Sequence, residues 1–251
     1  MIVAVLLLTR IGVAADEIRV MTSGAFTAAY LELAPAFERA TGHRIVTDAT
    51  SMGTGPTGIA ARLERGEAID VVIVADTDLE RLATAGRIRP GTRVDLARSE
   101  IGMAVRRGTP KPDISSVDAL RRTLLDAKSI AYSASVSGTY LSTELFQRLG
   151  IADRVLPKSR RIEGGERVGA VVARGEAEIG FQQVSELLPI DGIDYVGPLP
   201  AEVQRVTIFS AGVGAASTNP AAAKSFIDFL ASSAAIRIIR NTSLEAVAVE
   251  H

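Results

Sequence analysis

The segment GEAIDVVIVAD, residues 66–76, decides the fold of this 251-residue chain. Residues 71–75 are apolar without alternation, which is typical of a strand buried on both faces of a sheet. Helices are expected on either side, at 59–64 and 79–85, and Gly86 is placed to end the second one. A fully buried strand between two helices indicates an α/β fold.

Strand-like and helix-like segments alternate outward from this strand in both directions. The expected strands are 18–21, 44–47, 70–75, 101–106, 129–132, 178–182 and 206–213. The other expected helices are 28–40, 117–126, 140–149, 168–174, 221–230 and 234–240. The last two helices have no strands of their own to cover, so they should return to the first half of the fold.

The pattern predicts two α/β lobes joined by two chain crossings. Residues 16–100 and 213–251 are assigned to the first lobe and residues 101–212 to the second. Hinge strands are expected near 101–107 and 205–212. A paired connection of this kind permits the lobes to close around a ligand.

Residues 1–15 have the features of a secretory signal peptide. An apolar run at 2–8 is followed by small residues at 13–15, directly before the polar Asp16. The run is too short to span a bilayer. No basic residue precedes it, and this leaves two alternatives, a true start further upstream or a buried strand.

Composition excludes several classes of function. Lys plus Arg number 28 and Asp plus Glu 29, for a net charge of −1, so nucleic acid is not expected as a partner. There is no Cys, and the two histidines are His43 and His251. Thiol chemistry and His-rich zinc sites are therefore excluded, and no metal or cofactor is expected. A small anionic ligand fits this inventory.

Four polar segments, 22–27, 50–58, 135–139 and 163–167, each precede a helix. Free N–H groups and the positive end of the helix dipole bind anions there, and Ser and Thr add hydroxyl donors. Helix capping alone also explains such residues. Two amides, Gln182 and Gln183, stand at the end of the strand expected at 178–182. With these two, the candidate ligand-binding residues are Ser23, Gly24, Ala25, Ser51, Thr54, Thr57, Ser137, Gly138, Gly165, Arg167, Gln182 and Gln183.

A dinucleotide site is an alternative interpretation of residues 53–58. These residues match G-x-G-x-x-G, and Asp76 follows at the spacing of a ribose-binding acid. Pro56 inside the loop and the short helix after it argue against a Rossmann crossover.

The segments LAPAFERATG (33–42), GEAIDVVIVAD (66–76) and VARGEAEIG (172–180) resemble the extracytoplasmic solute-binding proteins of ABC importers, in particular the molybdate-binding group. The resemblance extends from residue 18 to residue 230. It implies the type II periplasmic-binding-protein fold, a periplasmic location, an ABC permease in the inner membrane as partner, and a monomer.

In that group, hydroxyls and backbone N–H groups of three loops, with a tyrosine after the I-G strand, bind a tetrahedral oxyanion. Ala25 and Gln183 stand here at the positions of a loop serine and of that tyrosine. The departures favour an organic di- or tricarboxylate over molybdate. We therefore expect a binding protein that captures a small anion for an ABC importer.

The alternative comes from a similar branch, the periplasmic aconitate isomerases, and it leaves open whether the chain is an enzyme. Their reaction is an allylic proton shift that needs a base, an acid and donors to stabilise a carbanion, without a cofactor. Glu163, Glu166, Tyr140 and His43 are the acid–base candidates, and the sequence does not choose among them.

Overall fold

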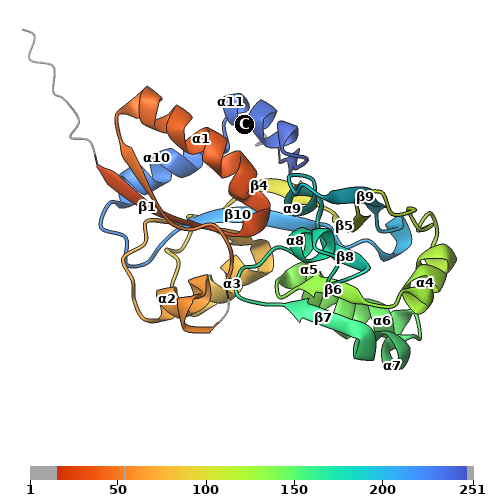
Figure 1. The fold of residues 1–251 in the computed structure, drawn as a ribbon. Helices are drawn as coiled ribbons and strands as arrows, with labels where there is room; N and C mark the ends of the chain where they lie inside the picture. Colours follow the sequence, from red (N-terminus) through yellow and green to blue (C-terminus); the bar gives the residue numbers. More distant parts are fainter. Residues whose placement is uncertain (1–15, 54, 248–251) are drawn as a thin grey trace, which may run out of the picture.

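The computed structural model describes residues 16–53 and 55–247, which form two β-sheets with helices on both faces of each (Figure 1). The strand order is β11-β4-β10-β3-β1-β2 in the first sheet and β7-β6-β8-β5-β9 in the second. None of the described helices is long and apolar enough to cross a membrane. The signal peptide expected at 1–15 lies outside the described residues.

The first sheet combines segments from both ends of the chain. Its strands are β1 (Glu17–Thr22), β2 (Arg44–Ala49), β3 (Val71–Ala75), β4 (Val94–Ser99), β10 (Thr207–Val213) and β11 (Glu245–Ala246). Its helices are α1 (Gly24–Thr41), α2 (Ile59–Glu64), α3 (Asp76–Thr84), α10 (Pro220–Leu230) and α11 (Ser233–Asn241). The last two helices return to this sheet, as the sequence predicts.

The second sheet is built from the middle of the chain. Its strands are β5 (Ile101–Arg106), β6 (Ile130–Ser133), β7 (Ser159–Ile162), β8 (Ile179–Gln183) and β9 (Ile193–Pro198). Its helices are α4 (Val117–Asp126), α5 (Val136–Tyr140), α6 (Phe146–Arg148), α7 (Ala152–Val155), α8 (Val168–Ala173) and α9 (Val184–Leu187).

The buried strand β3 shows why its sequence is continuously apolar. Val71 and Ile73 face the core that contains Phe226 of α10, whereas Val72 and Val74 face a second core against α2 and α3. Alternate residues of a strand point to opposite faces, so a strand covered on both faces needs apolar residues at every position.

Two helices begin earlier than the sequence predicts. α1 begins at Gly24 instead of residue 28, and the helix expected at 140–149 begins at Val136 and contains a π-helical turn at Leu141–Leu145. Strands β4, β7, β9 and β11 were not predicted. β7 reads SRRI, and its charged residues hide the strand pattern because it lies at a sheet edge.

The chain passes between the sheets twice. Glu100 separates β4 from β5, and residues 199–206 separate β9 from β10. β10 pairs with β3 and β4, so the strand that the sequence places at the second crossing belongs to the first sheet. At the crossings, Gln204 accepts a hydrogen bond from Ile101 N and donates one to Ile101 O, both at 3.0 Å. The division into moving lobes stays a prediction.

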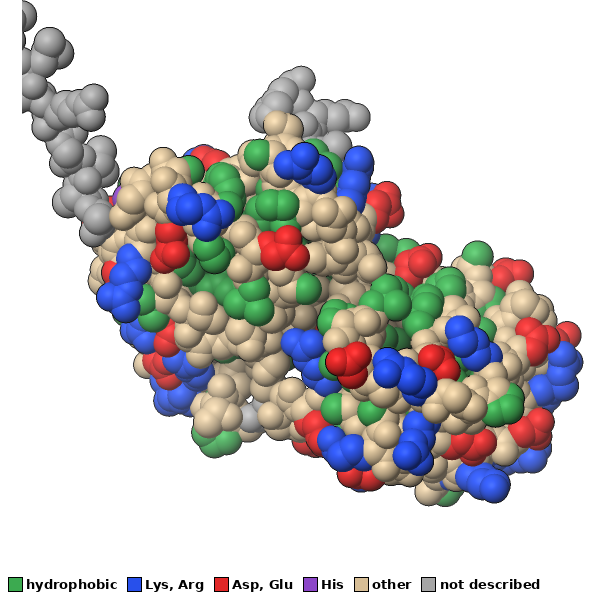
Figure 2. Space-filling view, turned by 45° about the horizontal axis from the view of Figure 1, so that its top comes forward, with side chains coloured by type: hydrophobic (Ala, Val, Ile, Leu, Met, Phe, Trp, Pro, Cys, Tyr) green, Lys and Arg blue, Asp and Glu red, His purple; other side chains and the backbone are tan. Residues whose placement is uncertain are grey.

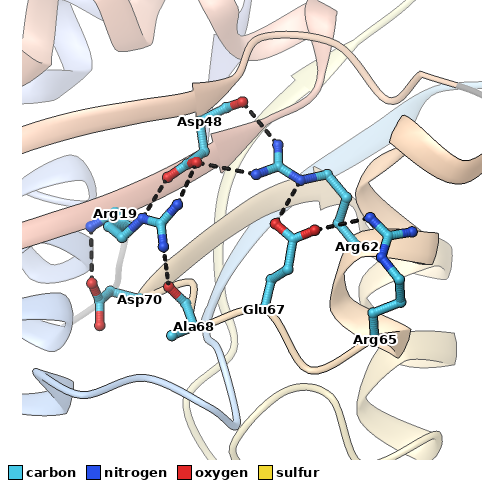
Figure 3. A network of polar contacts seen from close by, with 7 residues as sticks. All are labelled: Arg19, Asp48, Arg62, Arg65, Glu67, Ala68 and Asp70. Atoms are coloured by element: carbon cyan, nitrogen blue, oxygen red, sulfur yellow. Dashed lines mark hydrogen bonds and ion pairs between the residues drawn. The ribbon is translucent and has the colours of Figure 1, made fainter.

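A polar network joins β1, β2 and α2 on either side of the loop that follows β2 (Figure 3). Asp48 accepts hydrogen bonds from Arg19 at 2.7 and 2.9 Å and from Arg62 at 3.1 Å. Arg62 also pairs with Glu67 at 2.8 Å. Burial raises the pKa of Asp48, but the two arginines outweigh it and hold that pKa below its usual value. The network holds α2 and its preceding loop against the sheet.

Candidate functional site at the cavity between the sheets

A cavity of about 70 Å³ lies between the two sheets, and we call it the inner cavity. It is lined by residues at or just after the carboxyl ends of β1, β2, β3, β6, β7 and β8. Ligands of open α/β sheets bind at this edge, because loops from several strands meet there. A space of this size is concave and suits a small ligand.

Seven of the residues predicted from the sequence line the inner cavity. They are Ser23, Gly24, Ala25, Ser51, Gly165, Gln182 and Gln183. Thr57 is exposed and does not line it, and Thr54 lies outside the described residues. Ser137, Gly138 and Arg167 also do not line it. Residues of all four helix-start segments thus meet at the inner cavity, although some residues of each segment do not line it.

Ser23 is the N-cap residue of α1 and lies inside the inner cavity. It is 4% exposed, and its hydroxyl has no hydrogen-bond partner among the described residues. Its backbone N–H donates a hydrogen bond to Ile73 O at 2.8 Å. An unpartnered buried hydroxyl at the positive end of an 18-residue helix is a donor available to an anion.

Three serines form a hydroxyl cluster on the other side of the cavity. Ser133 Oγ lies 2.8 Å from Ser135 Oγ and 3.0 Å from Ser137 Oγ. Gly138 lies behind them, and a Cβ at this position would collide with the carbonyl oxygen of Ser133. Gly138 therefore serves the close packing of α5 against β6, whereas Ser133 and Ser135 face the cavity.

Gln182 and Gln183 line the cavity, but their amides also form hydrogen bonds within the protein. Gln182 Oε1 accepts a hydrogen bond from Val168 N at 2.9 Å. Gln183 is joined to the Thr207 hydroxyl at 2.8 Å, and with its oxygen accepting that bond its nitrogen donates to Ser99 Oγ at 3.0 Å. Gln183 thus connects β8 to β4 and β10 across the two sheets.

Asp78, Ser133, Ser135 and Glu186 line the cavity but were not named as candidates from the sequence, and Glu186 is the buried acid among them. It belongs to α9, directly after β8, and is 9% exposed. Burial raises the pKa of Glu186 to about 7, and the charge of Arg167 and the Gln182 amide limit the rise. Its carboxyl packs on Gly24, where a Cβ would collide with Oε1. A signal was present, since Glu186 stands beside Leu187 and Leu188 in a short apolar segment.

The other acids near the inner cavity are paired with arginines. Asp78 and Glu166 line it, but they contact Arg81 at 3.1 Å and Arg174 at 2.6 Å respectively. Glu163 does not line it and pairs with Arg161 at 3.2 Å.

Tyr140 and His43, the remaining acid–base candidates, do not line the inner cavity. The Tyr140 hydroxyl donates to Val203 O at 2.8 Å in the core of the second sheet. His43 lies beyond the C-terminal end of α1, stacked on Phe37. Because α1 has 18 residues, His43 is about 27 Å from the end that borders the cavity.

A wider space of about 550 Å³, the outer cavity, adjoins the inner one. The two share lining residues, among them Gly53, Asp78 and Ser135. Arg81, Arg161 and Arg205 line only the outer cavity. Over the visible face of the whole molecule, charges of both signs are interspersed (Figure 2). The acids Glu64, Asp78 and Glu144 line the outer cavity as well, so its lining is of mixed charge.

Among the described residues, no three acidic or histidine side chains are grouped as metal ligands would be. The polar part of the lining consists of hydroxyls, glycine backbone, helix N-termini, two glutamine amides and the buried carboxyl of Glu186, beside apolar side chains such as Met52, Ile162 and Phe209. This set can bind a small oxygen anion and hold a titratable group against it.

The chain belongs to the family of bacterial extracellular solute-binding proteins, which matches residues 18–242. Its fold is that of the type II periplasmic binding proteins. The periplasmic molybdate-binding protein of Azotobacter vinelandii superposes with a TM-score of 0.71 at 20% identity, over 93% of this chain and all of the other. A periplasmic thiamin-binding protein gives 0.72 at 16% identity, over 94% and 84%.

Sequence relatives are closer than these structures. The chain is 45% identical over 229 residues to an aconitate isomerase of Pseudomonas sp., covering 91% of this chain and 87% of the relative. It is 28% identical over 177 residues to the molybdate-binding protein ModA of Azotobacter vinelandii, covering 69% and 67%. The two groups that the sequence resembles, the molybdate-binding proteins and the aconitate isomerases, are therefore both found among its relatives.

Proposed function

We propose that this protein is a periplasmic, cofactor-free isomerase that interconverts cis- and trans-aconitate in the inner cavity. The observation that carries the proposal is the 45% identity with an aconitate isomerase over 91% of the chain. At 28%, the match to a molybdate-binding protein is weaker and covers less of the chain.

The site supports a polycarboxylate over a tetrahedral oxyanion. Ala25 offers no hydroxyl, and the Gln183 amide is bonded to Thr207 and Ser99 of the first sheet. Hydroxyls of Ser23 and Ser51 and the start of α1 remain as donors for a carboxylate.

The second candidate function is a receptor that delivers a small anion to an ABC permease. The family favours it. The two halves are in contact, since a Cβ on Gly165 would be 2.7 Å from Ser51 Oγ. Closure of this kind suits a receptor and an enzyme equally, because both enclose a ligand.

The test is to incubate the purified protein with each aconitate isomer and follow the other isomer by proton NMR. We expect conversion to the same equilibrium mixture from both sides. A thermal-shift series with molybdate, sulfate, citrate and both aconitates runs in parallel, because a ligand of the folded state raises the melting temperature. Stabilisation by molybdate with no conversion of aconitate would overturn the proposal in favour of the receptor.

A further inference from the structure

We propose that Glu186 is the single group that carries the proton in this reaction, taking it from one allylic carbon of the substrate and returning it to the other. The inference rests on the proposed function and adds to it the residue that performs the transfer. Three observations carry it: the place of Glu186 in the inner cavity, the pairing of the other acids, and the contact with Gly24.

Among the described residues, the inner cavity has three acidic side chains, Asp78, Glu166 and Glu186. Asp78 and Glu166 are each engaged in an ion pair, with Arg81 at 3.1 Å and with Arg174 at 2.6 Å respectively. The Glu166 side chain is also 43% exposed. Glu186 is 9% exposed, and no arginine of the part of the chain that the structure describes lies within ion-pair distance of it. It is the acid in this lining whose proton can be gained and lost inside the cavity.

The Glu186 carboxyl lies at the first turn of α1 because Gly24 has no side chain. Any side chain at residue 24 would occupy the position of Oε1. The N-terminal end of α1 carries a partial positive charge that stabilises negative charge nearby. The same helix end can therefore stabilise the Glu186 carboxylate before proton transfer and the substrate dienolate after it.

The proton balance needs no other reagent. The Glu186 carboxylate removes a proton from the substrate methylene, and the C–H electron pair delocalises through the double bond into the conjugated carboxylate. The Glu186 carboxylic acid then gives that proton to the former vinyl carbon, and a double bond forms at the former methylene. Glu186 ends in its starting state, and no electron is gained or lost.

The pKa of Glu186 agrees with this role. Burial raises it to about 7, so the two protonation states are of similar free energy near neutral pH. The charged groups around it are Arg167 before α8, Asp78 of α3 and Glu166 of the loop before α8. Arg167 lowers the pKa of Glu186, and the amide of Gln182 lowers it further.

Glu186→Gln is the central variant, because the amide keeps the shape and removes the acid–base function. We expect kcat to fall by about a thousandfold or more. The thermal shift caused by trans-aconitate should persist, since the hydroxyls and the α1 terminus are unchanged. Glu32→Gln is the matched control: Glu32 is exposed on α1 and lines neither cavity, and we expect kcat within about twofold of the wild type.

The outcomes separate the two proposals. A wild type that does not convert aconitate overturns the proposed function. A wild type that converts it and a folded Glu186→Gln variant with the same kcat overturn only the assignment of Glu186. If the amide variant does not fold, Glu186→Asp retains a carboxyl but withdraws it by one methylene. A tenfold or larger loss of kcat with unchanged KM supports the assignment, and an unchanged kcat contradicts it.

Isotope transfer tests whether one group does both steps. Trans-aconitate deuterated at the methylene is converted in ordinary water for a single turnover. A single buried carrier returns deuterium to the same molecule, so part of the product keeps both deuterons. Product that has lost one deuteron in every molecule would contradict a single carrier. Mass spectrometry of the cis isomer distinguishes the two results.

Discussion

Ser23 and Glu186 are buried polar residues at the same helix terminus, and their environments give them different roles. The Ser23 hydroxyl has no hydrogen-bond partner among the described residues. The Glu186 carboxyl packs against Gly24 without an ion-paired arginine. Buried polar groups without strong partners destabilise the free protein, so their presence points to a ligand that supplies what is missing.

Replacing Ser23 with alanine should weaken ligand binding without loss of stability. The hydroxyl bonds to nothing among the described residues, so its removal leaves no group unpaired. In the complex it donates to a carboxylate, and we expect the Kd for trans-aconitate to rise about tenfold. Isothermal titration calorimetry measures this. Ser115→Ala, an exposed serine hydrogen-bonded to Asp113, is the control and should leave the Kd unchanged.

Glu186 should make the folded protein less stable as the pH rises. Its pKa is raised to about 7 by burial, above its usual value of 4.5, so the folded state binds this proton more tightly. The stabilisation is present below pH 4.5 and is lost as the pH rises through 7, a change of about 3 kcal/mol in the free energy of unfolding.

Urea unfolding at pH 5.0 and pH 7.5 measures this dependence. The Glu186→Gln variant cannot ionise at residue 186 and should lose less stability between the two values than the wild type. Equal losses in both proteins would show that Glu186 does not titrate in this range.

At the scale of elements, the first turn of α5 is positioned by one close contact. Gly138 lies against the carbonyl oxygen of Ser133 at the end of β6, where no Cβ fits. This contact brings Ser133 and Ser135 to the cavity, with Ser137 bonded behind them. Gly138 was predicted from the sequence to bind ligand, and in the structure it fixes the packing of α5 against β6, between which the serine hydroxyls meet.

Gly138→Ala should therefore lower the free energy of unfolding by about 2–4 kcal/mol, because backbone atoms must move to admit the methyl group. Gly197→Ala in β9 is the matched control. Its Cβ would lie 3.8 Å from Ile114, an ordinary contact, and we expect a change of less than about 1 kcal/mol. Chemical denaturation of both variants checks the difference, and equal effects would contradict the packing role of Gly138.

For the whole molecule, two glutamines connect the halves where the chain crosses between the sheets. Gln204 bonds to both backbone groups of Ile101, and Gln183 bonds to Thr207 of β10. Gln204 lies within the second crossing, whereas Gln183 ends β8 and bonds to Ser99 and Thr207, which flank the two crossings. They restrict the crossings to a narrow set of conformations.

Gln204→Ala leaves Ile101 N without its acceptor, and we expect the free energy of unfolding to fall by about 1–2 kcal/mol. Ligand affinity should also weaken, because less of the protein is held in the conformation that encloses the ligand. Gln147→Ala, at an exposed position on α6, is the control. Urea unfolding and calorimetry with trans-aconitate test both effects. Unchanged values for Gln204→Ala would contradict the role of this connection.

Most of the architecture could be predicted from local sequence. The apolar run of β3, the Gly ends of helices and the two unpaired C-terminal helices are properties of neighbouring residues, so they remain visible without a structure. The missed strands are short or charged, and their pairing depends on partners distant in the chain. Seven of the predicted residues line the cavity, because strand ends of an α/β sheet meet at one edge whatever their exact side chains.

The sequence by itself determined the alternation of strands and helices, the return of the C-terminal helices and the helix-start segments that border the site. These features can be predicted from the sequence because periodicity and helix termini are properties of neighbouring residues. Only the tertiary structure decided the position of Glu186, the bonding of Gln183 and the packing role of Gly138. Each depends on the order of strands in the sheets, which places β8 between β6 and β5 and brings α9 against α1.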